Sequence, residues 1–172
     1  GDVIKSTTAI IEKNPLYTTT TSDYTAYDQT MRSMESELTA MHNMINSVYK
    51  KQQQLHNLLN KLGDDEKYKS VKTVGDSLVK KMKTWDEEMV QRKSKAYDDV
   101  ENFPNKFTSD YLYLINQTES DLPRVNQPNI DLMQQMNMQW AELKKRGEHL
   151  LNTEIPALNK LLWDAGIGGI WE

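Results

Sequence analysis

The chain has 172 residues and a net charge of −4 at pH 7, with 21 Lys and Arg against 25 Asp and Glu. It contains no cysteine, which excludes disulfide scaffolds, thiolate metal sites and cysteine nucleophiles. No run approaches the roughly 18 apolar residues of a membrane-spanning helix, and the evenly spread charges leave no basic surface for a nucleic acid.

The first 21 residues differ in composition from the rest. Gly1 in place of an initiator methionine suggests a fragment of a longer protein, and the opening residues do not form a signal peptide. Residues 1–21 are rich in Thr and Ile, which favour strands, and Asn14-Pro15 favours a turn. We therefore expect residues 1–21 to be a linker or the remnant of a preceding β-segment, and residues 22–172 to form a helical bundle domain.

A long apolar seam begins after this segment. Its members follow one another at alternating steps of three and four residues: Tyr24, Tyr27, Met31, Met34, Leu38, Met41, Ile45, Val48, Gln52, Leu55, Leu59 and Leu62. The pattern predicts a helix near 60 Å long, at about 1.5 Å per residue. Ser22 or Asp23 is expected to cap its start, and Gly63 to end it. Such a seam must be buried against other helices of similar length.

A second helix is expected after the acids at 64–66, which suit the positive end of a helix dipole. The sequence extends this helix to about Tyr97, and the short turn makes it antiparallel to the first. Its predicted seam is Val71, Val74, Leu78, Met82, Trp85, Met89 and Arg92. The Lys-rich run from Lys67 to Lys83 is interleaved with acids, and we interpret it as a solvated helix face.

Pro104 starts a short third helix that ends near Gln117. Its apolar face is expected to be Phe107, Tyr111, Leu114 and Ile115. A loop with two prolines then leads to the last helix, at 129–165. Its predicted seam is Met133, Met136, Trp140, Leu143, Gly147, Leu150, Glu154, Ala157 or Leu158, and Leu161.

Two residues mark the end of this last helix. Pro156 should kink it, or split it at Glu154-Ile155, and Gly166 should stop it with Ile167 folded back. The predicted fold is therefore all-α: an antiparallel up-down bundle of three long helices and one short one, with an extended N-terminal stub.

The sequence contains few of the residue patterns that catalytic or metal-binding sites require. It lacks the Glu-x-x-His pairs of carboxylate-bridged metal centres, and His42 and His56 lie about 21 Å apart on the first helix. We therefore predict no catalytic residue, no metal ligand and no cofactor. Trp85 and Trp140 fall on seams and are expected in the core. Trp163 and Trp171 lie near the chain end, and they are the candidates for exposed contacts, for example with sugar rings.

Two segments carry a family resemblance. In the first, Asn14-Pro15-Leu16 precedes a Thr-rich stretch, and the residues at 22–24 (Ser, Asp, Tyr) lead into the long helix. In the second, residues 102–104 (Asn-Phe-Pro) open the short helix, and residues 156–159 (Pro-Ala-Leu-Asn) fall near the end of the last one. This order resembles the region after the propeller in secreted bacterial proteins with BNR/Asp-box, sortilin-like β-propellers, often labelled glycosyl hydrolases. The family has Asp-Pro-Arg at 14–16, and the resemblance covers about residues 12–170.

The resemblance implies the C-terminal helical domain of a larger exported protein, which is secreted, periplasmic or at the surface of a bacterium. Its implied partners are the propeller and the β-segment of the same polypeptide. It implies no catalysis here, because the presumed active surface of the family lies on the propeller. We therefore expect a non-catalytic structural or interaction domain that is monomeric as a fragment.

Two alternatives stay open at this point. One is a stand-alone coiled-coil interaction module, which would oligomerise through leftover apolar surface. The other is a carbohydrate-binding or hydrolysing helical domain, in which Trp163, Trp171 and the acids would have to converge on a cleft.

Overall fold

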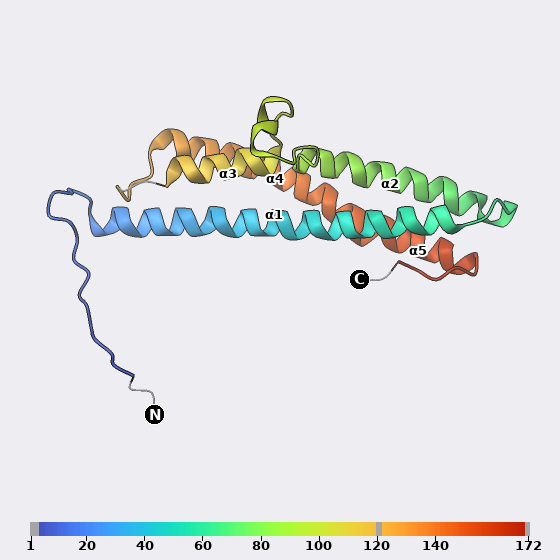
Figure 1. The fold of residues 1–172 in the computed structure, drawn as a ribbon, viewed down its shortest axis with the longest axis horizontal. Coiled ribbons are helices and arrows are strands. Elements are labelled where there is room, and N and C mark those ends of the chain that lie inside the picture. The colour runs from blue at the N-terminus through green and yellow to red at the C-terminus, as the bar shows by residue number, and fades with distance from the viewer. Residues whose placement is uncertain (1–3, 120–121, 171–172) are drawn as a thin grey trace.

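The computed structural model describes residues 4–119 and 122–170, and every regular element within them is helical (Figure 1). The α-helices are α1 (Thr21–Lys61), α2 (Lys69–Met89), α3 (Phe107–Thr118), α4 (Gln127–His149) and α5 (Ile155–Asp164). Two short 3₁₀ turns, Glu66–Tyr68 and Tyr97–Glu101, precede α2 and α3, and a π turn (Leu150–Glu154) joins α4 to α5 without a break. The predicted all-α fold is confirmed.

The helices form three antiparallel rods (Figure 1). The first rod is α1. The second consists of α2 and α3, which lie end to end along α1 with residues 90–106 looping out between them. The third runs back through α4, the π turn and α5, and it contacts both other rods. None of the helices in the described part of the chain has the length and apolarity needed to cross a membrane.

The core follows the predicted seams closely in the first and second rods. From α1 the buried side chains are Met34, Met41, Ile45, Val48, Leu55 and Leu59; from α2 and α3 they include Val71, Leu78, Met82, Trp85, Met89, Phe107, Tyr111, Leu114 and Ile115. Tyr24 and Val74 are wrong predictions, because they are 37% and 41% exposed. The neighbouring Gly75 lies in the interface instead, so close that a Cβ there would stand 2.7 Å from Cδ2 of Leu59.

The ends of α1 differ from the prediction. Thr20, and not Ser22 or Asp23, is the N-cap: its N–H donates to Asp23 Oδ2 at 2.8 Å, and Asp23 N–H donates back to Thr20 Oγ1 at 3.2 Å. This reciprocal pair satisfies two amide groups that the first helical turn leaves unpaired. At the other end the extended backbone of Leu62 ends the helix, and Gly63 does not adopt the left-handed conformation expected of it.

The second helix ends at Met89, not near Tyr97. Val90 is extended, and the side chain of Arg92 turns back to the last turn of α2, where it binds Asp86. Thr108 Oγ1 also donates to Met89 O at 2.9 Å, which satisfies a carbonyl at the helix end. Arg92 therefore lies beyond the helix, although the seam pattern includes it.

In the third rod, the buried positions depart from the predicted heptad pattern at the π turn. Leu158 is buried as predicted, but the predicted Glu154 and Leu161 are not, and Ile155 and Leu162 are buried in their place. Pro156 explains the shift: it has no N–H, and its ring would clash with the carbonyl of residue 152 in a regular α-helix. A π turn holds one extra residue. The helix is not split at Glu154-Ile155: the backbone stays helical through Leu150–Glu154, and the predicted disturbance at Pro156 takes the form of a π turn before α5 begins at Ile155.

The C-terminal end of the described chain folds back onto α5. Gly166 has φ of 72° and Ile167 N–H donates to Leu162 O at 2.8 Å, which confirms the predicted stop. The side chain of Asn159 then holds Ile170 from both sides, accepting from its N–H at 2.8 Å and donating to its carbonyl at 3.1 Å. Ile170 is buried as a result.

Residues 4–18 form an extended segment outside the bundle, and Thr19, next to the cap of α1, is buried (Figure 1). The predicted turn is present, because Asn14 accepts from Leu16 N–H through its side chain and from Tyr17 N–H through its carbonyl. Four bulky apolar side chains of this segment are between 85% and 98% exposed: Ile4, Ile10, Ile11 and Leu16. The bundle thus completes its core without them.

Candidate functional site

The two tryptophans predicted to make exposed contacts do not define a site. Trp163 lies on α5 with its side chain 61% exposed, and Trp171 lies outside the described residues. Trp85 and Trp140 are buried in the core, as their seam positions predict.

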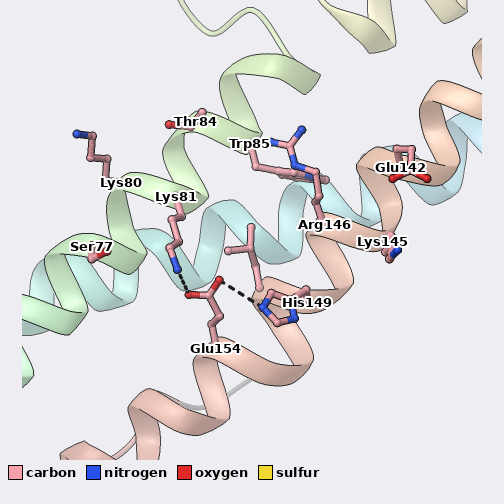
Figure 2. Close-up of a pocket in the computed structure, with 11 residues that line it drawn as sticks. Ser77, Lys80, Lys81, Thr84, Trp85, Glu142, Lys145, Arg146, His149 and Glu154 are labelled. Carbon is pink, nitrogen blue, oxygen red and sulfur yellow. Dashed lines mark hydrogen bonds and ion pairs between the residues drawn. The ribbon is translucent and has the colours of Figure 1, made fainter.

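An open groove of about 680 Å³ lies between α2 and the third rod (Figure 2). In Figure 2 the ribbon of α1 passes behind the groove. We call it the α2/α4 groove. Its lining residues are Ser77, Lys80, Lys81, Thr84 and Trp85 from α2, Glu142, Lys145, Arg146 and His149 from α4, and Leu150 and Glu154 from the π turn.

The floor of the groove is set by a close approach of all three rods. Trp85 is fully buried, and its Nε1–H donates to the carbonyl of Leu143 on α4 at 2.8 Å. Gly147 faces the indole: a Cβ at this position would stand 2.9 Å from Trp85 Cζ2 and 2.5 Å from Met44 Sδ of α1. Only a residue without a side chain allows this packing, so Gly147 brings α4 onto the indole.

The π turn places Glu154 across the groove from α2. One carboxylate oxygen of Glu154 contacts Lys81 Nζ at 2.6 Å, and the other lies 3.7 Å from Nε2 of His149 (Figure 2). The predicted seam puts Glu154 among the core positions, but the extra residue of the π turn rotates it to the groove. π turns inside α-helices occur frequently at functional sites.

A second cross-rod ion pair borders the groove. Arg146 of α4 binds Glu88 of α2 with two parallel hydrogen bonds, both of 2.7 Å. The hydrogen bond from Arg146 holds the pKa of Glu88 below its usual value, and the same contact raises the pKa of Arg146. Burial acts against both shifts, because it disfavours the charged forms.

We expect replacement of Glu88 by glutamine to lower the free energy of unfolding at pH 7 by less than about 1 kcal/mol, because the Glu88 side chain is 41% exposed. The folded pKa of Glu88 is lowered, so its contribution is present above the unfolded pKa near 4.5 and is lost as the pH falls through the folded pKa. Urea unfolding at pH 7 and pH 2.5 tests this: the two proteins should differ at pH 7 and converge at pH 2.5. A difference that is unchanged at pH 2.5 would contradict it.

The remaining cations of the groove have no such partner. Within residues 4–119 and 122–170, neither Lys80 on the α2 wall nor Lys145 on the α4 wall contacts a carboxylate. Four Lys or Arg and two Glu line the groove, so its lining carries two more positive than negative charges, in a chain whose net charge is −4.

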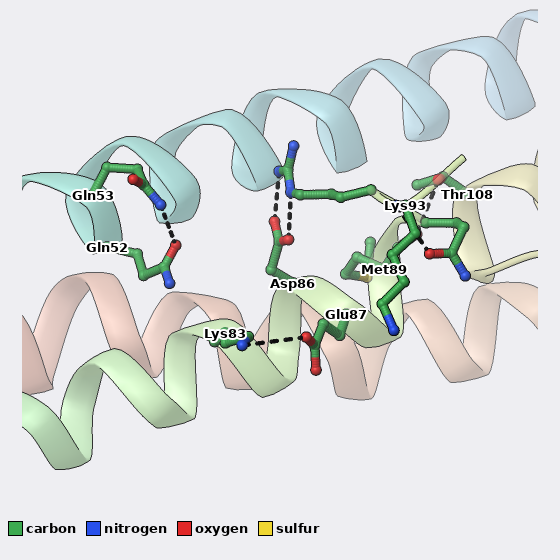
Figure 3. Close-up of polar contacts among 10 residues, drawn as sticks. Gln52, Gln53, Lys83, Asp86, Glu87, Met89, Lys93 and Thr108 are labelled. Atoms are coloured by element: carbon green, nitrogen blue, oxygen red, sulfur yellow. Dashed lines mark hydrogen bonds and ion pairs between the residues drawn. The ribbon is translucent and has the colours of Figure 1, made fainter. Parts of the chain in front are cut away.

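A separate polar cluster fixes the loop after α2 (Figure 3). Arg92 binds the buried Asp86 through Nε at 2.5 Å and Nη2 at 2.6 Å, and its guanidinium lies 3.8 Å from the ring centre of Tyr49 on α1. Gln91 Nε2 donates to Pro104 O at 3.1 Å. These contacts attach residues 90–106 to the bundle. None of the residues that form them lines the groove.

His42, His56 and Tyr111 lie outside the groove lining. No group of three potential metal ligands occurs among the residues that the structure describes. His42 and His56 are exposed. Burial raises the pKa of Tyr111 to about 12, and its hydroxyl contacts Asn137 Oδ1 at 2.9 Å. This shift keeps the phenol protonated, whereas a catalytic acid or base needs a pKa near the working pH.

The sequence analysis missed the α2/α4 groove. It interpreted the Lys67–Lys83 run as a solvated face, and the lysines at 80 and 81 are indeed exposed, but they also line the groove. Two signals in the sequence point to it: a glycine at a seam position of the last helix, and Pro156 one turn after the groove. Neither shows which side chains the neighbouring rod places opposite.

No protein-family model, curated protein or solved structure matches this chain.

Proposed function

We propose that this chain is a non-catalytic helical interaction domain, a rigid bundle whose extended N-terminal segment pairs with β-structure. The observation that carries the proposal is the exposure of Ile4, Ile10, Ile11 and Leu16 beside a bundle that closes its own core. Side chains of this size gain about 1.5–3 kcal/mol each when they are buried. An extended Thr- and Ile-rich segment buries such side chains most simply by adding a strand to the edge of a sheet.

The resemblance to the region after bacterial BNR/Asp-box propellers supplies the source of that sheet. On this proposal the β-segment of the same polypeptide covers residues 4–13, and the parent protein is exported. The turn at Asn14 and the capping box at Thr20 fit this arrangement, because they separate an extended segment sharply from a helix.

The two alternatives predict other surfaces. A carbohydrate site needs an exposed aromatic face in a cleft, and the aromatic side chain in the α2/α4 groove, Trp85, is fully buried. A stand-alone coiled-coil module needs an apolar stripe left over on the bundle, and the seam of α1 from Met34 to Leu59 is covered by α2, α3 and α4. The interaction domain with a strand-forming stub fits the exposed surface better than either.

Hydrogen exchange tests the proposal. The backbone amides of residues 4–13 should exchange freely in the chain alone, and at least about tenfold more slowly in a longer polypeptide that includes the preceding β-segment. Amides of α1 between Met34 and Val48 serve as the control and should be protected in both. Equal exchange of residues 4–13 in the two proteins would contradict the strand pairing.

Two further measurements separate the alternatives. Turnover of a glycoside by residues 1–172 would contradict the non-catalytic role. Light scattering should give a monomer at all concentrations, whereas a concentration-dependent dimer would favour the coiled-coil module.

A further inference from the structure

We propose that the α2/α4 groove binds a short, extended acidic peptide segment of a partner protein. The proposal rests on the interaction role proposed above, but it concerns a different surface from the N-terminal segment. It starts from Lys80 on α2 and Lys145 on α4. Both lysines line the groove, and neither contacts a carboxylate of the described residues.

The charge distribution favours an acidic ligand. Two carboxylates at the groove are already paired, since Glu154 binds Lys81 and Glu88 binds Arg146, whereas Glu142 lines the groove and forms no ion pair among the described residues. Lys80 and Lys145 contact no carboxylate among the described residues, and the groove lining has more Lys and Arg than Glu on a protein of net charge −4, so the groove is a local positive region. Acidic side chains of a ligand would meet one unpaired cation on each wall, which raises the rate of encounter and fixes the orientation.

The same lining argues against a dense polyanion. Glu142 and Glu154 both line the groove, and each would repel a phosphate or a sulfated sugar placed between the walls. A peptide does not meet this difficulty, because its backbone N–H groups can donate to these carboxylates while its acidic side chains reach the lysines. The hydroxyl groups of Ser77 and Thr84 add donors and acceptors along the α2 wall.

The size of the groove fits a short extended segment. The α2 wall runs from Ser77 to Trp85, which is about 12 Å at 1.5 Å per helical residue. An extended chain advances about 3.3 Å per residue, so roughly four residues span this wall. The floor of Trp85 and Leu150 is apolar and closely packed, so it excludes water beneath the ligand.

The test is a titration of ¹⁵N-labelled protein with a capped hexapeptide of alternating alanine and glutamate, followed by amide chemical shifts. We expect saturable shift changes at amides between residues 77 and 85 and between 142 and 154. The double variant Lys80→Glu and Lys145→Glu should weaken binding about tenfold or more, the product of two reversed charge contacts. The matched control, Lys93→Glu with Lys95→Glu, makes the same charge change at exposed lysines outside the groove and should alter the affinity less than about twofold.

Several outcomes would overturn the proposal. They are no saturable shift in the wild-type protein, shifts outside the groove, and an equal loss of affinity in both double variants. Inorganic phosphate is titrated as the competing ligand. If phosphate binds the groove more tightly than the hexapeptide and displaces it, the site is a phosphate site and not a peptide site. None of these results changes the hydrogen exchange of residues 4–13, so the two proposals fail separately.

Discussion

Replacement of Trp85 by alanine is expected to lower the free energy of unfolding by about 3–5 kcal/mol, the usual cost of deleting a large buried aromatic side chain. The Trp85 side chain is fully buried at the point where all three rods meet. Its loss opens a cavity between Met44 and Gly147, and it also leaves the carbonyl of Leu143 without the indole donor. For a chain of this length, 1 kcal/mol corresponds to about 2–4 °C, so the melting temperature should fall by 6 °C or more.

Two further variants separate the causes. Trp85→Phe keeps most of the ring and removes the N–H, so it should cost about 1–3 kcal/mol, between the wild type and Trp85→Ala. Trp163→Ala is the matched control, because this tryptophan is 61% exposed, and its loss should cost less than about 1 kcal/mol. Urea unfolding followed by far-ultraviolet circular dichroism gives all three values. A Trp85→Ala protein within 1 kcal/mol of wild type would show that the indole does not organise the junction of the rods.

The same variant connects the core to the α2/α4 groove. Trp85 holds α2 on α4 through the hydrogen bond to Leu143 and through its contact with Gly147. Lys80 and Lys145 stand on these two helices, so their relative position depends on the indole between them. The groove and the stability of the bundle thus share one structural element.

Most of the fold could be predicted from the sequence because the seam of α1 is long and regular. Alternating steps of three and four residues place Met34, Met41, Ile45 and Val48 on one face, and these four are buried. The pattern stops being reliable where a local interaction competes with the helix. Thr20 caps α1 through a hydrogen bond to Asp23 that composition alone does not distinguish from caps at Ser22 or Asp23.

The phase shift in the third rod has a similar origin. A heptad pattern continued through Pro156 predicts Glu154 in the core, yet the step from Leu150 to the next buried residue, Ile155, is five. A step of five is the signature of a π turn, and the proline that causes it is visible in the sequence. The predicted disturbance at Pro156 is therefore present as a π turn; Leu158 is buried as predicted, whereas Glu154 and Leu161 are not buried.

The candidate site could not be predicted because it depends on a juxtaposition between rods. Lys80 and Lys145 are 65 residues apart and carry no motif. That both line one groove follows from the close approach of α2 and α4 at Gly147, which the seam pattern shows only as a small residue. Patterns along one helix do not give the distance to the next.

Replacement of Arg92 by alanine is the second change with a large expected effect. It leaves the carboxylate of Asp86 buried without its partner, which costs about 3–5 kcal/mol for a fully buried pair. Here the Asp86 side chain is 6% exposed and that of Arg92 38%, so solvent screening reduces the expected loss to about 2–3 kcal/mol. The contact of Arg92 with the ring of Tyr49 is lost as well. Hydrogen exchange in residues 93–103 should also accelerate, because Arg92 attaches this loop to the bundle.

The double variant Asp86→Leu with Arg92→Met identifies the source of this loss. Replacing both partners of a buried ion pair by apolar side chains of similar size is often neutral or stabilising, so the double variant should be more stable than Arg92→Ala. Arg32→Ala is the control: Arg32 pairs with Asp28 at 2.8 Å on the exposed face of α1, and its loss should cost less than about 0.5 kcal/mol. If the double variant is as unstable as Arg92→Ala, the specific Arg92–Asp86 charge pair stabilises the bundle. Desolvation of an unpaired Asp86 is then not the cause of the loss. Urea unfolding of the three variants decides between these two accounts.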